Sequence, residues 1–196
     1  GGATHSGDLA MIKDAIFSVL DSEPNSEFVL VHCVPGFFRD HKQIKAHYDF
    51  KPMKEYPAWL SSMGLDIGIA PLVDNNFNRG KSNLRWMEYS ALGIPTIASP
   101  LPHFVKSIAD GRTGFLCDSG DSWVHVLKEL IRNESLRKLV GSEAREEVKT
   151  KWNSECSGKQ YSEVLEAVHA ESIKKRSGNT GWGVDGRSEP HQMVVS

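Results

Sequence analysis

Four short apolar runs, each bounded by glycine, proline or polar turn residues, constrain the fold of this chain more than any other feature. They are too short for typical helices and too continuous for half-exposed strands, so each is predicted to be a strand buried within a sheet. The runs are residues 27–33 (EFVLVHC), 66–72 (DIGIAPL), 94–99 (IPTIAS) and 113–117 (TGFLC), with a further short strand expected at 46–50.

Segments with helical periodicity lie between and after these runs. Helices are predicted from residue 7 over about 13 residues, at 54–63, at 83–92, around 105–108, and in three segments beyond residue 120. Parallel neighbouring strands need crossover connections, so this alternation predicts an α/β fold with a Rossmann-like, doubly wound parallel sheet and helices on both faces. We assign residues 1–173 to one domain and residues 174–196 to a tail or linker, because the glycine-rich end shows no sustained period.

The composition limits the kinds of partner. The chain has 196 residues, with 23 Lys and Arg against 25 Asp and Glu, and a formal charge of −2. This balance provides no strongly basic surface, so no nucleic-acid partner is expected. No apolar run reaches the roughly 18 residues of a membrane span, and the first residues lack the features of a signal peptide. We expect a cytoplasmic protein, whose basic segment 174–176 could touch the inner face of a membrane.

The three cysteines do not suggest a metal or redox site. Cys33, Cys117 and Cys156 are widely spaced and form no C-x-x-C pair. They are expected to be reduced thiols.

The polar segment 74–88 is the expected binding site, because ligands of open α/β sheets bind beyond the carboxyl ends of the strands. Lys81 and Ser82 stand at the start of a predicted helix, whose free N–H groups and positive dipole end suit a phosphate or diphosphate. Arg79 adds a second cation. The alternative is a solvated loop in which Ser82 only caps the helix.

Glu88 follows Leu84 by one helical turn, about 6 Å along the axis from the first N–H groups of the helix. A carboxylate at that distance can accept hydrogen bonds from two vicinal hydroxyls of a ribose attached to a diphosphate. The alternative is an exposed ion pair with Arg85 or Lys81. The segment also approaches the pattern G-x-x-x-x-G-K-[ST], but Asn75 replaces its first glycine, which disfavours nucleotide hydrolysis.

Residues 81–99 read KSNLRWMEYSALGIPTIAS, and residues 110–116 read DGRTGFL. The first segment resembles the E-A-x-A-x-G-x-P-V-[IV]-A-[ST] signature of retaining glycosyltransferases with the GT-B fold, the family-4-like group 1. The second is similar to the D-G-x-T-G-[FL]-L element of that family, and the strand at 66–72 and Trp152 resemble two more elements. The resemblance covers about residues 1–170. It implies that the chain is the C-terminal, donor-binding domain of such an enzyme, with the acceptor-binding domain outside it.

The resemblance also implies roles for residues of segment 74–88. Glu88 corresponds to the second glutamate of the E-x7-E motif of the family, which holds the donor ribose. Ser82, Asn83 and Leu84 would offer backbone N–H groups to the diphosphate. The first glutamate of the motif falls on Gly80. Four nearby polar side chains are candidates to contact the donor sugar in its place: Asp74, Asn75, Asn76 and Asn78.

The first loop departs from the family, which places an arginine and a lysine there for the diphosphate. This chain has neither, so Thr4 and His5 are the polar candidates, and Lys81 and Arg79 are expected to bind the diphosphate instead. Alternatively, His5 makes only a contact at the start of its helix. The resemblance implies transfer with retention, in which helix dipoles and cations stabilise the leaving diphosphate and no metal is obligatory. The sequence contains no D-x-D metal motif.

Two histidines and a second function stay open. His32 ends a predicted strand and His103 follows a proline-rich turn, and each could face the site or serve only the structure. The expected partners are a nucleotide sugar, the acceptor-binding domain, and a glycan, lipid or protein acceptor. Because catalytic groups of the acceptor domain lie outside this chain, it is expected to bind the donor and to turn over poorly alone. The alternative hypothesis, motivated by Gly80 and the missing basic pair, is a non-catalytic nucleotide-binding or assembly module that keeps the fold without the chemistry.

Overall fold

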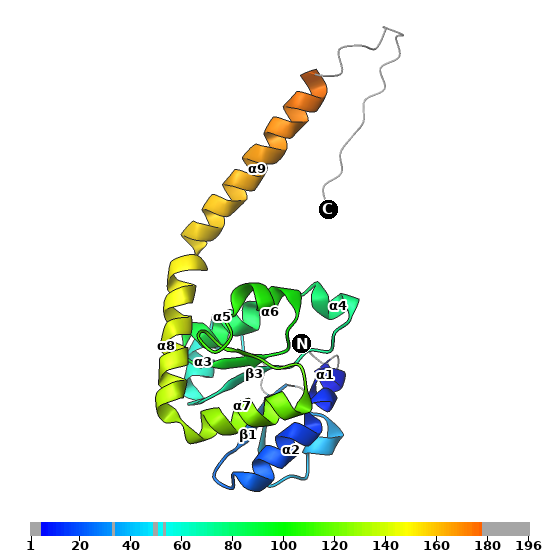
Figure 1. Ribbon diagram of the computed structural model, residues 1–196, viewed down its shortest axis with the longest axis vertical. Helices are drawn as coiled ribbons and strands as arrows, with labels where there is room; N and C mark the ends of the chain where they lie inside the picture. The colour runs from blue at the N-terminus through cyan, green and yellow to red at the C-terminus, as the bar shows by residue number, and fades with distance from the viewer. Residues whose placement is uncertain (1–4, 33, 49–50, 53, 178–196) are drawn as a thin grey trace. The chain divides into compact units, whose positions relative to one another are not determined.

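The computed structural model describes residues 5–32, 34–48, 51–52 and 54–177, and Figure 1 shows the path of the chain. The contacts divide the chain into two compact units, Gly1–Asn153 and Ser154–Ser196. Helices and strands alternate along the first unit, as the sequence predicts.

The described strands and helices of the first unit have the following bounds. The strands are β1 (Phe28–Val31), β2 (Ile44–His47), β3 (Gly68–Ala70), β4 (Thr96–Ala98) and β5 (Phe115–Leu116). The helices are α1 (Ser6–Met11), α2 (Lys13–Ser22), α3 (Tyr56–Ser62), α4 (Asn76–Arg79), α5 (Leu84–Ala91), α6 (Pro102–Ser107), α7 (Gly120–Arg132) and α8 (Glu134–Lys151), with a 3₁₀ turn, η2, at Gly36–Phe38.

The described strands pair in parallel. β1 pairs with β2, and β4 lies between β3 and β5, so that Ile97 stands opposite both Ile69 and Phe115. The central strand β4 is buried along its whole length. Helices join the successive parallel strands, which brings the carboxyl ends of β3 and β4 to the same edge. The predicted α/β class with parallel strands is confirmed.

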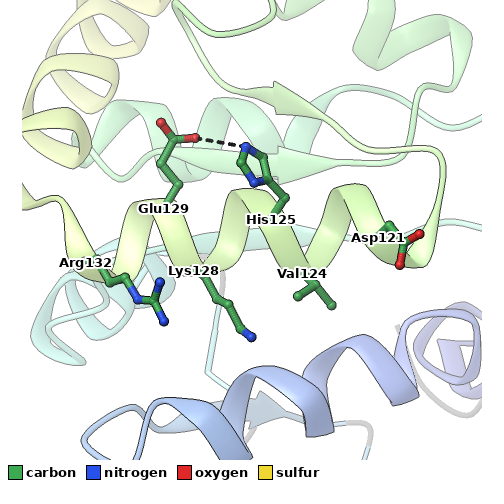
Figure 2. Close-up of a pocket in the computed structure, with 6 residues that line it drawn as sticks. All are labelled: Asp121, Val124, His125, Lys128, Glu129 and Arg132. Atoms are coloured by element: carbon green, nitrogen blue, oxygen red, sulfur yellow. Dashed lines mark ion pairs between the residues drawn. The ribbon is translucent and has the colours of Figure 1, made fainter.

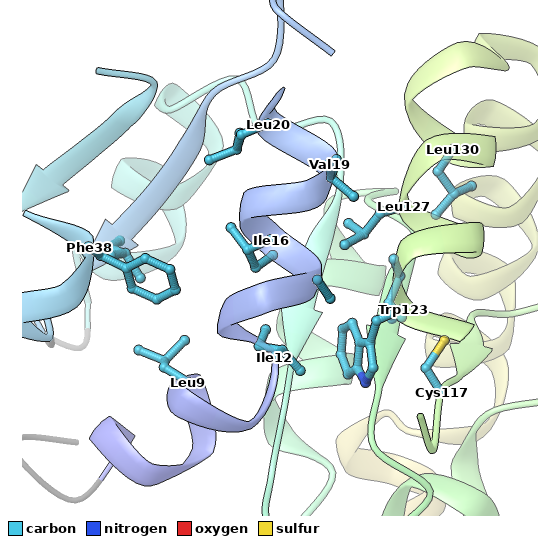
Figure 3. Packing of buried hydrophobic residues seen from close by; sticks show 13 residues of the cluster. Leu9, Ile12, Ile16, Val19, Leu20, Phe38, Cys117, Trp123, Leu127 and Leu130 are labelled. Carbon is cyan, nitrogen blue, oxygen red and sulfur yellow. The ribbon is translucent and has the colours of Figure 1, made fainter. Parts of the chain in front are cut away.

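The main hydrophobic cluster fixes α2 against the strands and α7. In Figure 3, Val19 of α2 faces Leu127 of α7 and Ile12 lies beside Trp123, while Ile16 lies on the side of α2 away from α7. All five side chains expose 6% or less of their surface. Burying aliphatic side chains of this size contributes about 1.5 to 3 kcal/mol each, so this cluster stabilises the packing of α2 on α7.

A second cluster lies beneath α5 and α6 and fixes their position. Trp86 is fully buried, and its Nε1 donates a hydrogen bond to the carbonyl of Thr113 at 2.9 Å. The ring meets Trp152 edge-on, with centroids 6.0 Å apart, and Phe104 of α6 belongs to the same cluster. These contacts hold α5 against the core.

α8 packs on the end of α5 through two glycines. Gly93 has a φ of +74°, which ends α5 in the predicted place. A Cβ added to Gly141 of α8 would lie 1.9 Å from the carbonyl oxygen of Gly93. Only glycine at position 141 permits this contact between backbones.

Several predicted element bounds were wrong. The helix expected from residue 7 is divided into α1 and α2, because Ile12 has a φ of −106° and a ψ of 6°. The strand expected at 46–50 is β2, which begins at Ile44 because its ladder with β1 pairs Phe28 with Ile44. The first strand was expected to be buried on both faces, but only Leu30 of β1 is buried and its other three residues are half-buried.

The polar loop after β3 also differs from the prediction. It contains the one-turn helix α4, because Asn75 accepts a hydrogen bond from the backbone N–H of Asn78 and caps the turn. The residue before α5 is Asn83, so Ser82 does not cap that helix.

The second unit contains α9 (Ser154–Ser177). The predicted end of the domain at residue 173 falls within this helix, and residues 178–196 of the predicted tail lie outside the described residues. Within the part of the chain that the structure describes, no helix combines the length and the apolar character needed to span a membrane.

Candidate functional site

The polar residues predicted as a site follow β3 and β4 at the carboxyl edge of their sheet. After β3 the chain runs through α4 to the start of α5, and after β4 it turns into α6. Asn83, which precedes α5, is buried, and its Nδ2 donates to Ser107 Oγ of α6 at 2.8 Å. Ser107 Oγ in turn donates to the carbonyl of His103 at 2.8 Å. This chain of hydrogen bonds joins the residue before α5 to the last residue of α6, Ser107, and through it to the carbonyl of His103.

A buried carboxylate, Asp8 of α1, holds the loop after β3 in place. Its side chain is only 5% exposed. Oδ1 accepts hydrogen bonds from the backbone N–H of Val73 at 2.8 Å and from Asn78 Nδ2 at 2.9 Å, while Oδ2 lies 3.0 Å from His5 Nδ1. Asp8 thus joins the first loop, which carries His5, to the predicted site.

Sequence analysis missed Asp8. The spacing of Asp8, Ile12 and Ile16 at intervals of four residues was the available signal, because it places a carboxylate on the face that carries buried residues. A charge on a buried face needs hydrogen-bond partners.

The four candidate sugar contacts have different surroundings. Asn78 is 3% exposed, and its Nδ2 is bound by Asp8 and by the carbonyl of Val73. Asn75 caps α4, and Asn76 is exposed. Asp74 is exposed but accepts two hydrogen bonds from the guanidinium of Arg79, one of them 2.7 Å long. This pairing lowers the pKa of Asp74 and raises that of Arg79, chiefly through the hydrogen bonds.

Lys81 lies between α4 and α5. Its Nζ is 5.1 Å from the centre of the Phe77 ring, and its backbone N–H donates to the carbonyl of Asn78 at 3.2 Å. Ser82 and Leu84 are exposed at the beginning of α5. The first N–H groups of a helix have no partner within the helix, so this end of α5 can donate to an anion.

Glu88 lies one turn farther along α5 and is 24% exposed. Its Oε2 accepts a hydrogen bond from Arg85 Nη1 at 2.8 Å, and the same Arg85 nitrogen donates to the Tyr56 hydroxyl at 2.6 Å. The ion pair that the sequence offered as an alternative is therefore present. Burial raises the pKa of Glu88, although the charge of Arg85 acts in the opposite direction. The carboxylate still has acceptor positions for a hydroxyl pair, since Arg85 contacts Oε2 alone.

His103 stands at the start of α6. Both ring nitrogens are buried and have no hydrogen-bond partner among the described residues. The pKa of His103 is lowered by burial and, to a smaller extent, by the positive charge of Lys81. Both effects favour the neutral imidazole, which has one donor and one acceptor nitrogen.

The structure thus brings most of the predicted site residues to one edge of the sheet. His5 is connected to them through Asp8. Thr4 lies outside the described residues. His32 has a φ of +67°, which is rare for a residue with a side chain. Residues 74–84 form the loop, α4 and the beginning of α5, and Glu88 completes the set.

Two other features lie apart from this edge. Figure 2 shows a shallow groove of about 480 Å³ along α7, where His125 and Glu129 form an ion pair at 3.9 Å. Its lining contains none of the predicted site residues. Among the described residues, no three His, Cys, Asp or Glu side chains gather in a way that could hold a metal ion. Cys117 is a buried free thiol, and burial raises its pKa to about 11.

Comparison with known proteins identifies the class. Residues 24–161 match the family model described as glycosyl transferase-like. This match covers more than half of the chain, so the chain belongs to the glycosyl transferase-like family. The predicted resemblance is confirmed.

Individual relatives agree with this assignment. The capsular polysaccharide biosynthesis glycosyltransferase CapM of Staphylococcus aureus is 29% identical over 94 residues, which are 47% of this chain and 24% of CapM. The C-terminal domain of LpcC, a glycosyl transferase group 1 family protein from Francisella tularensis, superposes with a TM-score of 0.60 at 20% identity, covering 77% of this chain and 81% of that domain.

A variant of S. aureus TarM, solved with Fondaparinux, α-GlcNAc-glycerol and UDP, has a TM-score of 0.66 at 13% identity. The match covers 82% of this chain and 33% of TarM. The fold is therefore that of one half of a GT-B glycosyltransferase. The chain spans about a quarter of CapM and a third of this TarM structure.

Proposed function

We propose that this chain binds a nucleoside-diphosphate sugar and supplies the donor half of a glycosyl transfer that retains the anomeric configuration. The start of α5 is the observation that carries the proposal. It combines the unpaired N–H groups of a first helical turn, the ammonium of Lys81 just before it, and the carboxylate of Glu88 one turn later. The UDP in the TarM structure supports a nucleotide ligand for this fold.

The diphosphate binds at the beginning of α5. Backbone N–H groups of Ser82, Asn83 and Leu84 donate to its oxygens, and Lys81 balances its charge. Glu88 accepts hydrogen bonds from the two ribose hydroxyls, with Arg85 holding the carboxylate in position. When the bond from the anomeric carbon to the diphosphate oxygen breaks, both electrons go to the diphosphate. The helix dipole and Lys81 stabilise the charge that develops there, so we propose that the reaction needs no metal ion.

The remaining predicted contacts divide by accessibility. Of the three asparagines before Gly80, Asn78 is buried and Asn75 caps α4, whereas Asn76 is exposed. Asn76 is therefore our first candidate for the sugar contact. Asp74 and Arg79 can reach the sugar or diphosphate only by giving up their mutual ion pair. His5 is 34% exposed, and with Nδ1 on Asp8 its Nε2 is the nitrogen that can meet the donor.

We propose further that the acceptor-binding domain lies in the part of the protein that this chain does not span. The acceptor would be a glycan, lipid or protein, and the transferred group a hexose, at a cytoplasmic site. The coverage of CapM and TarM supports a missing half. Alone, this chain is expected to bind the donor and to transfer sugar slowly or not at all.

A non-catalytic nucleotide-binding or assembly module is the second candidate. Two observations favour it: Gly80 stands where the family has a sugar-binding glutamate, and Glu88 already pairs with Arg85. Transfer of sugar by the longer protein would exclude this candidate.

The test is calorimetric titration of the chain with UDP, GDP, ADP and TDP, each compared with its monophosphate. Lys81→Ala and Glu88→Ala are each expected to weaken diphosphate binding by about 1 to 3 kcal/mol, because each removes a charge-assisted contact. Lys138→Ala is the matched control, since this lysine of α8 is 76% exposed and pairs with Glu134 of the same helix. If no diphosphate binds at millimolar concentration, or if the control weakens binding equally, the proposal is wrong.

A further inference from the structure

The unpartnered imidazole of His103 is the feature that the assignments above leave unexplained. Neither ring nitrogen has a hydrogen-bond partner among the described residues, although both are buried. The ring packs against Phe104 in a tilted arrangement, with centroids 4.3 Å apart. Unpaired buried polar atoms reduce stability, so a structural role for the imidazole leaves its nitrogens unexplained.

The backbone of His103 is fixed relative to the beginning of α5. The carbonyl of His103 accepts from Ser107, whose hydroxyl accepts from the buried amide of Asn83. Asn83 immediately precedes α5 and follows Lys81 by two residues. His103 therefore lies near the beginning of α5 and near Lys81, whose positive charge contributes to the lowered pKa of the imidazole.

We propose that His103 is a ligand of the leaving diphosphate, donating one imidazole N–H to a phosphate oxygen that Lys81 also contacts. This inference rests on the proposed function and deepens it by adding a binding residue. A neutral imidazole suits this position better than a second cation, because Lys81 already supplies the charge and a neutral donor avoids repulsion. Binding would pair a nitrogen that the free protein leaves without a partner.

The role predicts an unusual combination of effects. His103→Leu removes both nitrogens but keeps a similar volume, so the free protein should unfold at the same or a higher urea concentration. His103→Leu should bind the preferred nucleoside diphosphate of the wild type about tenfold more weakly, or weaker still, since a hydrogen bond to a charged group is lost. His103→Gln keeps a donor amide and should recover part of that affinity. A residue with only a structural role would show the opposite order, with lost stability and unchanged affinity.

The experiment measures the affinity of the wild type and both variants for UDP, GDP, ADP and TDP and for the corresponding nucleosides by calorimetry, with urea unfolding of the free proteins in parallel. His125→Gln, on an exposed histidine of α7, is the matched control and should change neither quantity. The ring ¹⁵N signals of His103 are recorded with and without the diphosphate, and a slowly exchanging ring N–H is expected only in the complex.

The outcomes separate the two proposals. If Lys81→Ala weakens diphosphate binding while His103→Leu binds as the wild type does, the inference about His103 is overturned and the proposed function stands. If His103→Leu weakens binding of the nucleosides as much as that of the diphosphates, the contact is not with the phosphates and the inference is also overturned. If the wild type binds no diphosphate, the proposed function is wrong, and the inference about His103, which rests on it, is overturned as well.

Discussion

Asp8 is the residue whose replacement most directly tests how the candidate site is built. Its carboxylate is 5% exposed and serves three donors: the N–H of Val73, Nδ2 of Asn78 and Nδ1 of His5. In Asp8→Ala the part-buried N–H of Val73 and one of the two N–H groups of Asn78 Nδ2 lose their partner, while the other N–H of Nδ2 keeps its bond to the Val73 carbonyl. At about 1 to 3 kcal/mol for each unpaired group, the loss should be about 4 kcal/mol. His5 is part-exposed and can turn to water, so it adds little.

Asp8→Asn should cost about half as much. The amide oxygen can still accept from Val73 and Asn78, but both bonds lose the assistance of a negative charge, at about 1 kcal/mol each. Asp14→Asn is the matched control, because Asp14 is 99% exposed on α2 and its replacement should stay within about 0.5 kcal/mol.

The assay is equilibrium urea unfolding of the wild type and the three variants, with m-values compared to verify that the same surface unfolds. Asp8→Ala is expected to lose the most stability, Asp8→Asn less, and the control Asp14→Asn the least. Asn78→Ala combined with Asp8→Ala should cost less than the sum of the two single losses, because the variants remove the same hydrogen bond. If Asp8→Ala is no more destabilising than Asp14→Asn, Asp8 does not hold the loop after β3.

Two further predictions concern α8 and Glu88. Gly141→Ala should destabilise the protein by about 1 to 3 kcal/mol or more in thermal or urea unfolding, because the new Cβ would lie 1.9 Å from the carbonyl oxygen of Gly93. Gly120→Ala, whose Cβ meets nothing within 4 Å, should be nearly neutral, and equal losses in the two variants would refute the contact. The pKa of Glu88 is raised in the folded protein, so the folded state binds more protons and the contribution of Glu88 to stability falls as pH rises from about 4.5 through the raised pKa. Glu88→Gln should therefore gain stability relative to the wild type across that interval in urea unfolding at successive pH values, and a pH-independent difference would contradict the shift.

The order of elements could be predicted because it depends on local patterns. Residues 94–99 are apolar and bounded by glycine and proline, and β4 lies there; Gly93 ends α5 because only a residue without a side chain adopts its positive φ readily. Element bounds were less predictable. β2 begins at Ile44 because of its ladder with β1, and α4 forms because Asn75 caps it, and neither pairing follows from a periodic pattern.

The site divides in the same way. Segment 74–88 was predicted at the carboxyl edge of the sheet from the position of a strand and a helix alone, and the structure places it there. The contacts of Asn78 were not predictable, because its partner Asp8 lies 70 residues earlier in the chain. The same is true of His103, whose position depends on Ser107 and Asn83.

By itself, the sequence determined the class of fold, the order of its elements and the family, because all three follow from hydrophobic periodicity and from short contiguous motifs. Only the tertiary structure decided which polar side chains are occupied and which are available. Asp74 pairs with Arg79 and Asn78 is enclosed by Asp8, whereas Asn76 is exposed and the ring nitrogens of His103 have no partner among the described residues. The physical reason is that hydrogen bonds and burial depend on distances between atoms, which folding sets between residues far apart in the chain.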